Sequence, residues 1–272
     1  MLGYHFFDYK FNIENFSSDL FSVSHIIFIV LSFVLVILLS IIFRKTSHKK
    51  MDVFIKVLSI VVAVLALVKI IWEICCNVFA GSDLNIAEIL PLDINSLFVY
   101  CLLIAAWCKN KMARECSLTF IATISMLGGA IGIVQCNWLN WYPFWTFGAL
   151  CPLIFYLVMF ATGMLLLFTC YKKLEWRDAL LGLMPVLILA IVAIPVNYLC
   201  GTDYMKIYAG SGIPVLSTFA QVLAVYGLRF IFTFIMLIAY IAFAAVVICL
   251  AKLICLIDNK IKAKKSVSEP EE

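Results

Sequence analysis

Residues 26–43, IIFIVLSFVLVILLSIIF, form an unbroken apolar run that ends at Arg44 and Lys45. The only polar side chains in the run are the hydroxyls of Ser32 and Ser40. A helix needs about 20 predominantly apolar residues to cross the hydrocarbon core of a bilayer, so this run predicts a transmembrane helix. Acidic residues precede it and no small-residue cleavage site follows, which favours a retained span over a secretory signal.

The rest of the chain has the same apolar character. Hydrophobic residues make up 65% of the 272 residues, charged residues make up 13%, and the mean hydropathy is +1.10. These values lie far from those of water-soluble globular proteins. The composition therefore predicts an all-α, polytopic transmembrane helix bundle in the cell membrane, with little chain left for a soluble domain.

Apolar runs divide the chain into seven expected spans. Pro91 suits the first turn of the third span, because proline lacks only an amide that would be unpaired there. In the fourth, Gly128, Gly129 and Gly132 would let a neighbouring helix approach closely. The expected spans are 26–43, 53–74, 91–107, 118–136, 147–170, 179–199 and 217–248. They imply an extracytoplasmic segment at 1–24, a seven-span domain at 25–257, and a disordered tail, basic and then acidic, at 258–272.

Basic residues give this topology a direction. One side of the expected bundle carries 16 of the 20 basic residues, whereas the other carries only Lys10 and Lys206. Basic loops stay in the cytoplasm, so the N-terminus is expected outside and the C-terminus inside. The 16 are Arg44, Lys45, Lys49, Lys50, Lys56, Lys109, Lys111, Arg114, Lys172, Lys173, Arg177, Lys252, Lys260, Lys262, Lys264 and Lys265. Because the net charge of +4 arises in these loops, it does not indicate nucleic-acid binding.

The 11 cysteines form no CxxC pattern, and most lie within apolar runs as small hydrophobic residues. Four fall near the expected outer surface, where a disulfide is one alternative: Cys75, Cys76, Cys136 and Cys200. The sequence also lacks HExxH, P-loop, GxSxG and EF-hand signatures, so no metal or cofactor is expected.

Several polar residues interrupt the apolar spans. Lys69 and Glu73 lie four apart on one helical face and are expected to pair with each other, either inside the bundle or reaching to the headgroups. Arg229 is expected about 18 Å below the outer start of the last span, pointing to Asp93, Glu73 or a bound anion. Helix-to-helix hydrogen bonding is the ordinary interpretation for Gln135 and Asn197.

Together these groups predict an outward-facing cavity within the membrane. The residues expected to line it are Lys69, Glu73, Asn95, Gln135, Asn197, Asp203 and Arg229. A general base there would be Asp93, Glu73 or Asp203, and the candidate nucleophiles are Ser96 and Cys151. A single serine or cysteine in a membrane helix more often serves packing than chemistry.

Two short segments resemble a known family. LPLDINS at 90–96 and NYLCGTDYM at 197–205 are similar to motifs of the YwaF-like bacterial membrane proteins, whose eukaryotic relatives include an acyltransferase acting on ether phospholipids. The family patterns are Leu-Pro-Leu-His-x-Cys and Gly-Thr-Asn-Tyr-Met, and the resemblance covers about residues 25–250. This chain has Asp93 and Asn95 in place of the histidine and cysteine of the first pattern, and Asp203 in place of the asparagine of the second. A further family histidine corresponds to Cys151.

Three hypotheses follow from these residues. The chain either binds a membrane lipid or an anionic headgroup, with acyl transfer put in doubt by the substitutions, or it transports a small molecule, or it is a non-catalytic membrane partner. An attack by Ser96 assisted by Asp93 stays conceivable under the first. The absence of a convincing internal repeat weakens the transport hypothesis, and nothing in the sequence fixes the oligomeric state.

Overall fold

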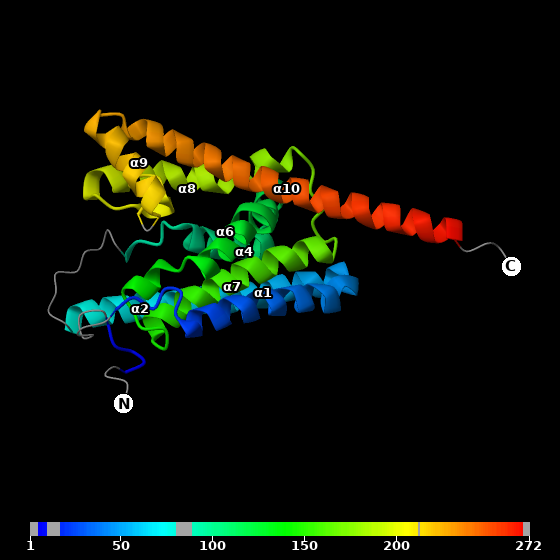
Figure 1. The fold of residues 1–272 in the computed structure, drawn as a ribbon, viewed down its shortest axis with the longest axis horizontal. Helices are drawn as coiled ribbons and strands as arrows, with labels where there is room; N and C mark the ends of the chain where they lie inside the picture. Colours follow the sequence, from blue (N-terminus) through cyan, green and yellow to red (C-terminus); the bar gives the residue numbers. More distant parts are fainter. Residues whose placement is uncertain (1–4, 10–16, 80–88, 212, 269–272) are drawn as a thin grey trace.

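The computed structural model describes residues 5–9, 17–79, 89–211 and 213–268, and from residue 255 onward only their backbone. Every regular element in these residues is a helix, in agreement with the predicted all-α class (Figure 1). The α-helices are α1 (Val23–Ile42), α2 (His48–Phe79), α4 (Ile94–Trp107), α5 (Lys111–Phe120), α6 (Met126–Val134), α7 (Phe147–Phe168), α8 (Asp178–Cys200), α9 (Pro214–Val225) and α10 (Arg229–Ser268). Short helical turns lie at η2 (Phe43–Lys45), η4 (Asn137–Asn140) and η5 (Tyr204–Lys206), and a π-helix, η3 (Ile121–Ser125), joins α5 to α6.

Six helical stretches are long and apolar enough to cross a bilayer. They are Val23–Lys45, His48–Val78, Lys111–Asn140, Phe147–Phe168, Asp178–Cys200 and Arg229–Ile254. The predicted third span is the 14-residue α4, which is about 21 Å long and shorter than these six. It begins only at Ile94, because Asp93 keeps an extended backbone. The described residues thus contain six candidate spans and two shorter apolar helices, α4 and α9, where the sequence predicts seven spans.

The predicted last span is wrong in one respect, because it is divided. α9 ends at Val225, and Gly227 adopts a left-handed conformation with φ of +70°. The Leu228 amide donates to the Leu223 carbonyl at 2.8 Å, and the Gly227 amide donates to that of Ala224 at 3.0 Å, which together form a Schellman helix ending. Arg229 is consequently the first residue of α10 and does not lie in the middle of a span.

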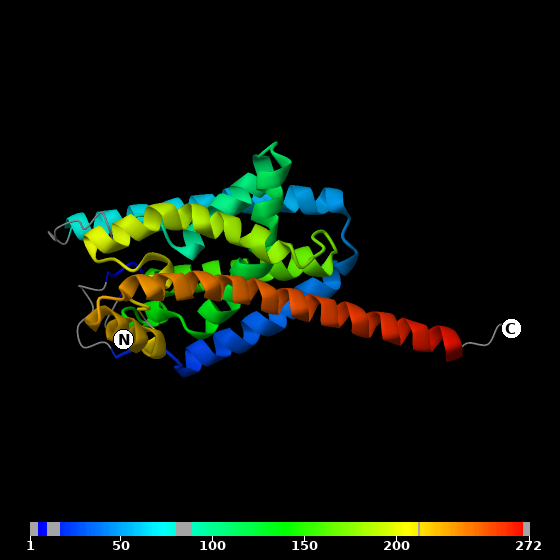
Figure 2. The same ribbon diagram turned by 90° about the horizontal axis from the view of Figure 1, so that it is seen from above.

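The two ends of the bundle differ in chemistry. We call the end formed by residues 5–9, 17–22, 137–146 and 201–211 the aromatic end, and the end formed by residues 43–50, 108–114 and 169–177 the basic end. At the aromatic end the Asp19 carboxylate accepts a hydrogen bond from the Phe144 amide at 2.8 Å, so the N-terminal segment is attached to the bundle. Figure 2 shows this segment beside the same end of the bundle as α9, opposite the C-terminus.

An ion pair and a hydrogen bond tie α2, α5 and the segment after α7 together near the basic end. Arg114 donates to the Asp52 carboxylate at 2.6 Å, and the Tyr171 hydroxyl donates to the same carboxylate. Burial and the hydrogen bond to Asp52 raise the pKa of Tyr171 to about 12. From this end α10 continues as a helix to Ser268, beyond the other helices, whereas the sequence predicts a disordered tail from residue 258 (Figure 1).

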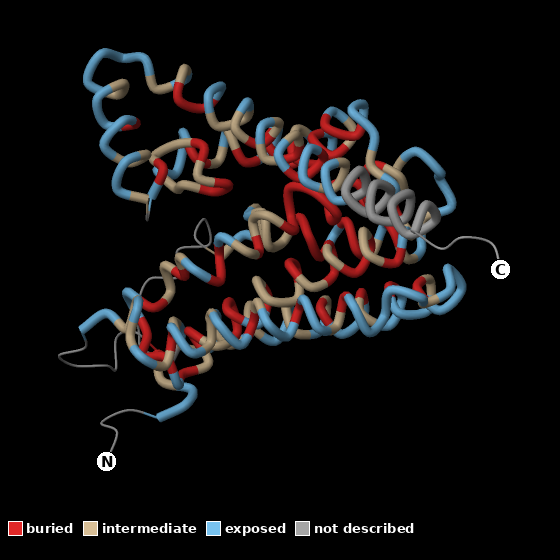
Figure 3. Tube along the Cα trace, turned by 45° about the vertical axis from the view of Figure 1, so that its right-hand side comes forward, coloured by how far each residue is buried: buried red, intermediate tan, exposed pale blue. Residues whose placement is uncertain are grey.

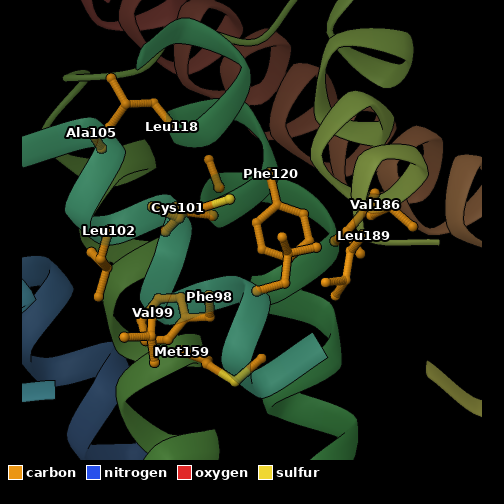
Figure 4. Close-up of a cluster of buried hydrophobic side chains, with 14 of the residues drawn as sticks. Phe98, Val99, Cys101, Leu102, Ala105, Leu118, Phe120, Met159, Val186 and Leu189 are labelled. Carbon is orange, nitrogen blue, oxygen red and sulfur yellow. The ribbon is translucent and has the colours of Figure 1, made fainter. Parts of the chain in front are cut away.

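The core lies where α4, α5, η3, α7 and α8 meet. Figure 3 shows buried residues gathered at the centre of the bundle, and Figure 4 shows Phe98, Leu102, Phe120, Met159 and Val186 converging there from α4, α5, α7 and α8. By contrast, only 17% of the most apolar 18-residue window is buried in each of the two stretches that contain α1 and α2, as expected of helices that face lipid.

Small residues bring α6 against α7, as predicted for two of the three glycines. A Cβ atom at Gly129 would lie 2.6 Å from the Tyr156 carbonyl oxygen, and one at Gly132 would overlap the Tyr156 ring. At Gly128 the nearest atom would be 4.0 Å away, so this glycine does not lie at the close approach.

Candidate functional site

The polar residues of the spans do not gather in one place. They form two groups at the aromatic end, one around residues 201–211 and one on α2. We call residues 201–211 together with the side chains that hold them, Asp93, Asn197, Thr233 and Tyr240, the loop cluster. We call Lys69 and Glu73 the dyad.

Asn197 fixes the start of the loop cluster from within α8. Its side chain is fully buried, and its Nδ2 donates to the Tyr204 carbonyl at 3.0 Å. Its Oδ1 accepts from the Tyr204 amide at 2.8 Å and from the Thr202 hydroxyl at 2.9 Å. The expected helix-to-helix bond is therefore replaced by bonds to the loop that follows α8.

Asp203 closes the loop on itself. One carboxylate oxygen accepts from the Tyr208 and Ala209 amides at 2.9 and 2.8 Å, and the other accepts from the Ser211 amide at 2.6 Å. These bonds satisfy backbone donors that have no helical partner. Asp203 is therefore a structural acceptor for the loop.

Asp93 connects this loop to α4. Its carboxylate accepts from the Met205 amide at 3.0 Å, while the Tyr240 hydroxyl of α10 donates to the Met205 carbonyl at 2.7 Å. Thr233 donates to the Ile207 carbonyl at 2.8 Å. Both polar groups of the Met205 backbone are thus held, which stabilises its positive φ of 59°.

The two candidate residues next to Asp93 do not complete a catalytic pair with it. Asn95 lies within hydrogen-bonding reach of the Tyr156 hydroxyl on α7. Ser96 lies in the first turn of α4, and no hydrogen bond joins it to Asp93 in the described part of the chain. The expected activation of Ser96 by Asp93 has no geometric support.

Arg229 has a different partner from the one predicted. Its guanidinium donates to the Tyr208 hydroxyl and lies 4.3 Å from the centre of the Tyr208 ring. Among the described residues, no ion pair joins Arg229 to Asp93 or Glu73. The prediction failed because it assumed an unbroken last span, which would have carried Arg229 deeper into the bundle.

The dyad forms as predicted. Lys69 Nζ and Glu73 Oε1 are 2.8 Å apart, with side chains 20% and 12% exposed. Lys69 Nζ also lies 4.3 Å from the centre of the Trp138 ring. Counted along α2, Lys69 lies 10 residues, or about 15 Å, from Phe79.

A connected set of aromatic rings includes Trp138, the ring that lies against Lys69. The Trp72 ring lies 5.4 Å from Tyr9, 5.9 Å from Tyr142 and 5.1 Å from Phe147, and Tyr142 lies 6.0 Å from Trp138. We call Tyr9, Trp72, Trp138, Tyr142 and Phe147 the aromatic layer. Trp138 and Tyr142 lie in one loop, whereas Tyr9 and Trp72 are distant from that loop along the chain, so sequence order alone does not bring these rings together.

The thiol of Cys151 lies beneath the dyad. Its residue is only 2% exposed, and it is near enough to Lys69 and Glu73 to interact with both charges. Cys151 belongs to the hydrophobic core beside Phe155 and Met159. This environment is that of a packed thiol and not of an accessible nucleophile.

Comparison with protein families identifies the chain. A model of the TMEM164 family matches residues 20–243, which is more than half of the sequence. The chain belongs to the TMEM164 family. No curated protein and no solved structure matches it significantly. In this TMEM164-family chain the match includes both the dyad and the loop cluster, and it ends within α10.

Gln135 and the outer cysteines complete the set of predicted residues in this TMEM164-family member. Gln135 is partly buried and ends α6. The thiols of Cys75, Cys76, Cys136 and Cys200 are free, so the alternative of a disulfide among them is not realised. No cluster of three or more histidine, cysteine, aspartate or glutamate side chains able to hold a metal occurs among the described residues.

Proposed function

We propose that this multi-pass TMEM164-family protein binds a membrane phospholipid by its headgroup at the aromatic end, without transferring an acyl chain. The dyad is the observation that supports the proposal. A single charge in hydrocarbon costs about 3 kcal/mol, so charged side chains within spans usually have a partner or a function. The side chains of Lys69 and Glu73 are both still partly exposed. They offer charge to a ligand that approaches from the bilayer.

The environments of the candidate catalytic groups do not support acyl transfer. Asp93 and Asn95 stand where the YwaF-like pattern has histidine and cysteine, and the Asp93 carboxylate already accepts a backbone hydrogen bond. Cys151 is buried beside charges that make no hydrogen bond to its thiol in any described contact. A nucleophile needs a base within hydrogen-bonding reach, which neither Ser96 nor Cys151 has among the described residues.

We also propose that the basic end faces the cytoplasm, in line with the 16 basic residues on that side. Two exposed thiols report on this directly, since Cys200 ends α8 at the aromatic end and Cys170 follows α7 at the basic end. A membrane-impermeant maleimide added to intact cells is expected to label Cys200 and spare Cys170. In a background that carries Cys75→Ser and Cys76→Ser, which removes the two free thiols near the end of α2, the signal should vanish in Cys200→Ser and persist in Cys170→Ser. The reverse pattern would invert the topology.

Lipid binding is tested by native mass spectrometry of the protein released from mild detergent. The wild type is expected to retain about one phospholipid per chain, and the double variant Lys69→Met/Glu73→Gln is expected to retain several-fold less. Lys56→Met is the matched control, because Lys56 lies on the same helix with its Nζ 5.5 Å from a tryptophan ring centre, at the basic end. If the wild type retains no phospholipid, the proposal fails and the partner hypothesis takes its place.

A further inference from the structure

We infer that the dyad selects zwitterionic phospholipids, with the headgroup phosphate on Lys69 and the headgroup amine on Glu73 beneath the aromatic layer. This inference rests on the proposed function and names its ligand class. Phosphoethanolamine and phosphocholine headgroups carry a phosphate and a cationic nitrogen joined by a short carbon linker. Lys69 and Glu73 present the opposite charges side by side, 2.8 Å apart.

Both members of the dyad keep bonding capacity after they pair with each other. A lysine ammonium has three N–H donors, and an ionised carboxylate has about four acceptor positions. The Lys69–Glu73 contact uses one of each, and the Trp138 ring covers one side of the ammonium. A phosphate oxygen can therefore accept from Lys69, and an ammonium can donate to Glu73, without breaking the existing ion pair.

The charge balance of the site argues against an anionic headgroup. Lys69 is already neutralised by Glu73, and the other candidate cation, Arg229, belongs to the other polar group and is bound to Tyr208 there. A lipid that carries only negative charge would bring its phosphate to Lys69, but it would have no cation to offset the repulsion from Glu73. A zwitterion instead matches a site whose own charges sum to zero, so both of its charges meet an opposite charge.

The aromatic layer adds a preference for the cationic part of the headgroup. The layer reaches the dyad through Trp138, whose ring centre lies 4.3 Å from Lys69 Nζ, and Trp138 is connected through Tyr142 to the ring of Trp72. Aromatic faces attract ammonium groups, and quaternary ammonium groups are commonly recognised in this way. Glu73 therefore supplies the charge for any headgroup amine, and the rings favour phosphatidylcholine further.

The test is competitive retention of phosphatidylcholine and phosphatidylglycerol of identical acyl chains, measured by native mass spectrometry after reconstitution in equimolar vesicles. The wild type is expected to retain phosphatidylcholine about fivefold over phosphatidylglycerol, a difference of about 1 kcal/mol. Glu73→Gln is expected to abolish this preference, because it removes both the attraction for the amine and the repulsion of the anion. Lys69→Met is expected to lower retention of both lipids. Glu175→Gln, an exposed carboxylate at the basic end, serves as the control.

A second variant keeps the inference testable if Glu73→Gln does not fold. Trp72→Leu leaves both charges in place and is expected to lower retention of phosphatidylcholine relative to phosphatidylethanolamine. If the wild type retains lipid but binds phosphatidylglycerol as well as phosphatidylcholine, the inference is overturned and the proposed function stands. If it retains no lipid, both fail. A preference for phosphatidylcholine that Glu73→Gln leaves unchanged would also overturn the assignment to the dyad.

Discussion

Replacing Lys172 with methionine is expected to lower the free energy of unfolding by about 4 kcal/mol. The Lys172 side chain is only 6% exposed, contacts the Glu115 carboxylate and lies 3.3 Å from Asp178 Oδ1. Asp178 is itself 1% exposed, so removal of the lysine leaves a buried carboxylate without its cation. The measurement is unfolding by SDS in mixed micelles, followed by circular dichroism.

Two variants separate this effect from a general loss of charge. Arg177→Met breaks the neighbouring pair with Glu175, whose side chains are 74% and 64% exposed, and is expected to cost less than about 1 kcal/mol. Lys172→Met/Asp178→Asn removes the buried charge together with its partner and should recover part of the loss. If Lys172→Met were no more costly than Arg177→Met, the buried network would not stabilise the basic end.

Replacing Gly129 with alanine is expected to destabilise the protein by about 3 kcal/mol, although alanine favours helices. The new Cβ would lie 2.6 Å from the Tyr156 carbonyl oxygen and 2.7 Å from the Phe160 amide nitrogen. Both atoms belong to the backbone of α7, so no side-chain rotation can relieve the overlap. Thermal unfolding in detergent, monitored by size-exclusion chromatography, measures the loss.

The adjacent glycine provides the control for this prediction. At Gly128 an added Cβ meets its nearest atom, Ile94 Cγ2, only at 4.0 Å. Gly128→Ala is therefore expected to be neutral or to stabilise the helix by about 0.5 kcal/mol. Equal losses in the two variants would show that the approach of α6 to α7 does not depend on Gly129.

The helices were predictable because hydrocarbon permits few backbone structures. Residues in a span must satisfy their backbone hydrogen bonds internally, so a long apolar run predicts a helix almost by itself. The breaks were harder to predict. Gly227 interrupts an otherwise apolar stretch, and a single glycine is often tolerated within a helix, so the division into α9 and α10 could not be inferred from hydropathy.

The site was predictable only where partners lie close in sequence. Lys69 and Glu73 are four residues apart, and helical geometry alone brings them together. Asp93, Asn197 and Asp203 all have backbone partners in residues 202–211. Such contacts depend on a loop conformation that includes Met205 at positive φ, which its residue type does not predict.

The loop cluster also fixes the order in which contacts can form while the protein is synthesised. Asp93 and Met205 are 112 residues apart, and Tyr240 follows Met205 by a further 35. The ribosome synthesises the chain from its N-terminus. The Asp93 carboxylate before α4 therefore cannot bind the Met205 amide until the loop after α8 has been made. α10 thus completes a connection that begins at α4. A nascent chain that stops before Tyr240 would leave the Met205 carbonyl without its donor, and a chain that lacks Asp93 would leave the Met205 amide without its acceptor. Cellular quality control would therefore meet an unpaired backbone group at the same residue in both cases.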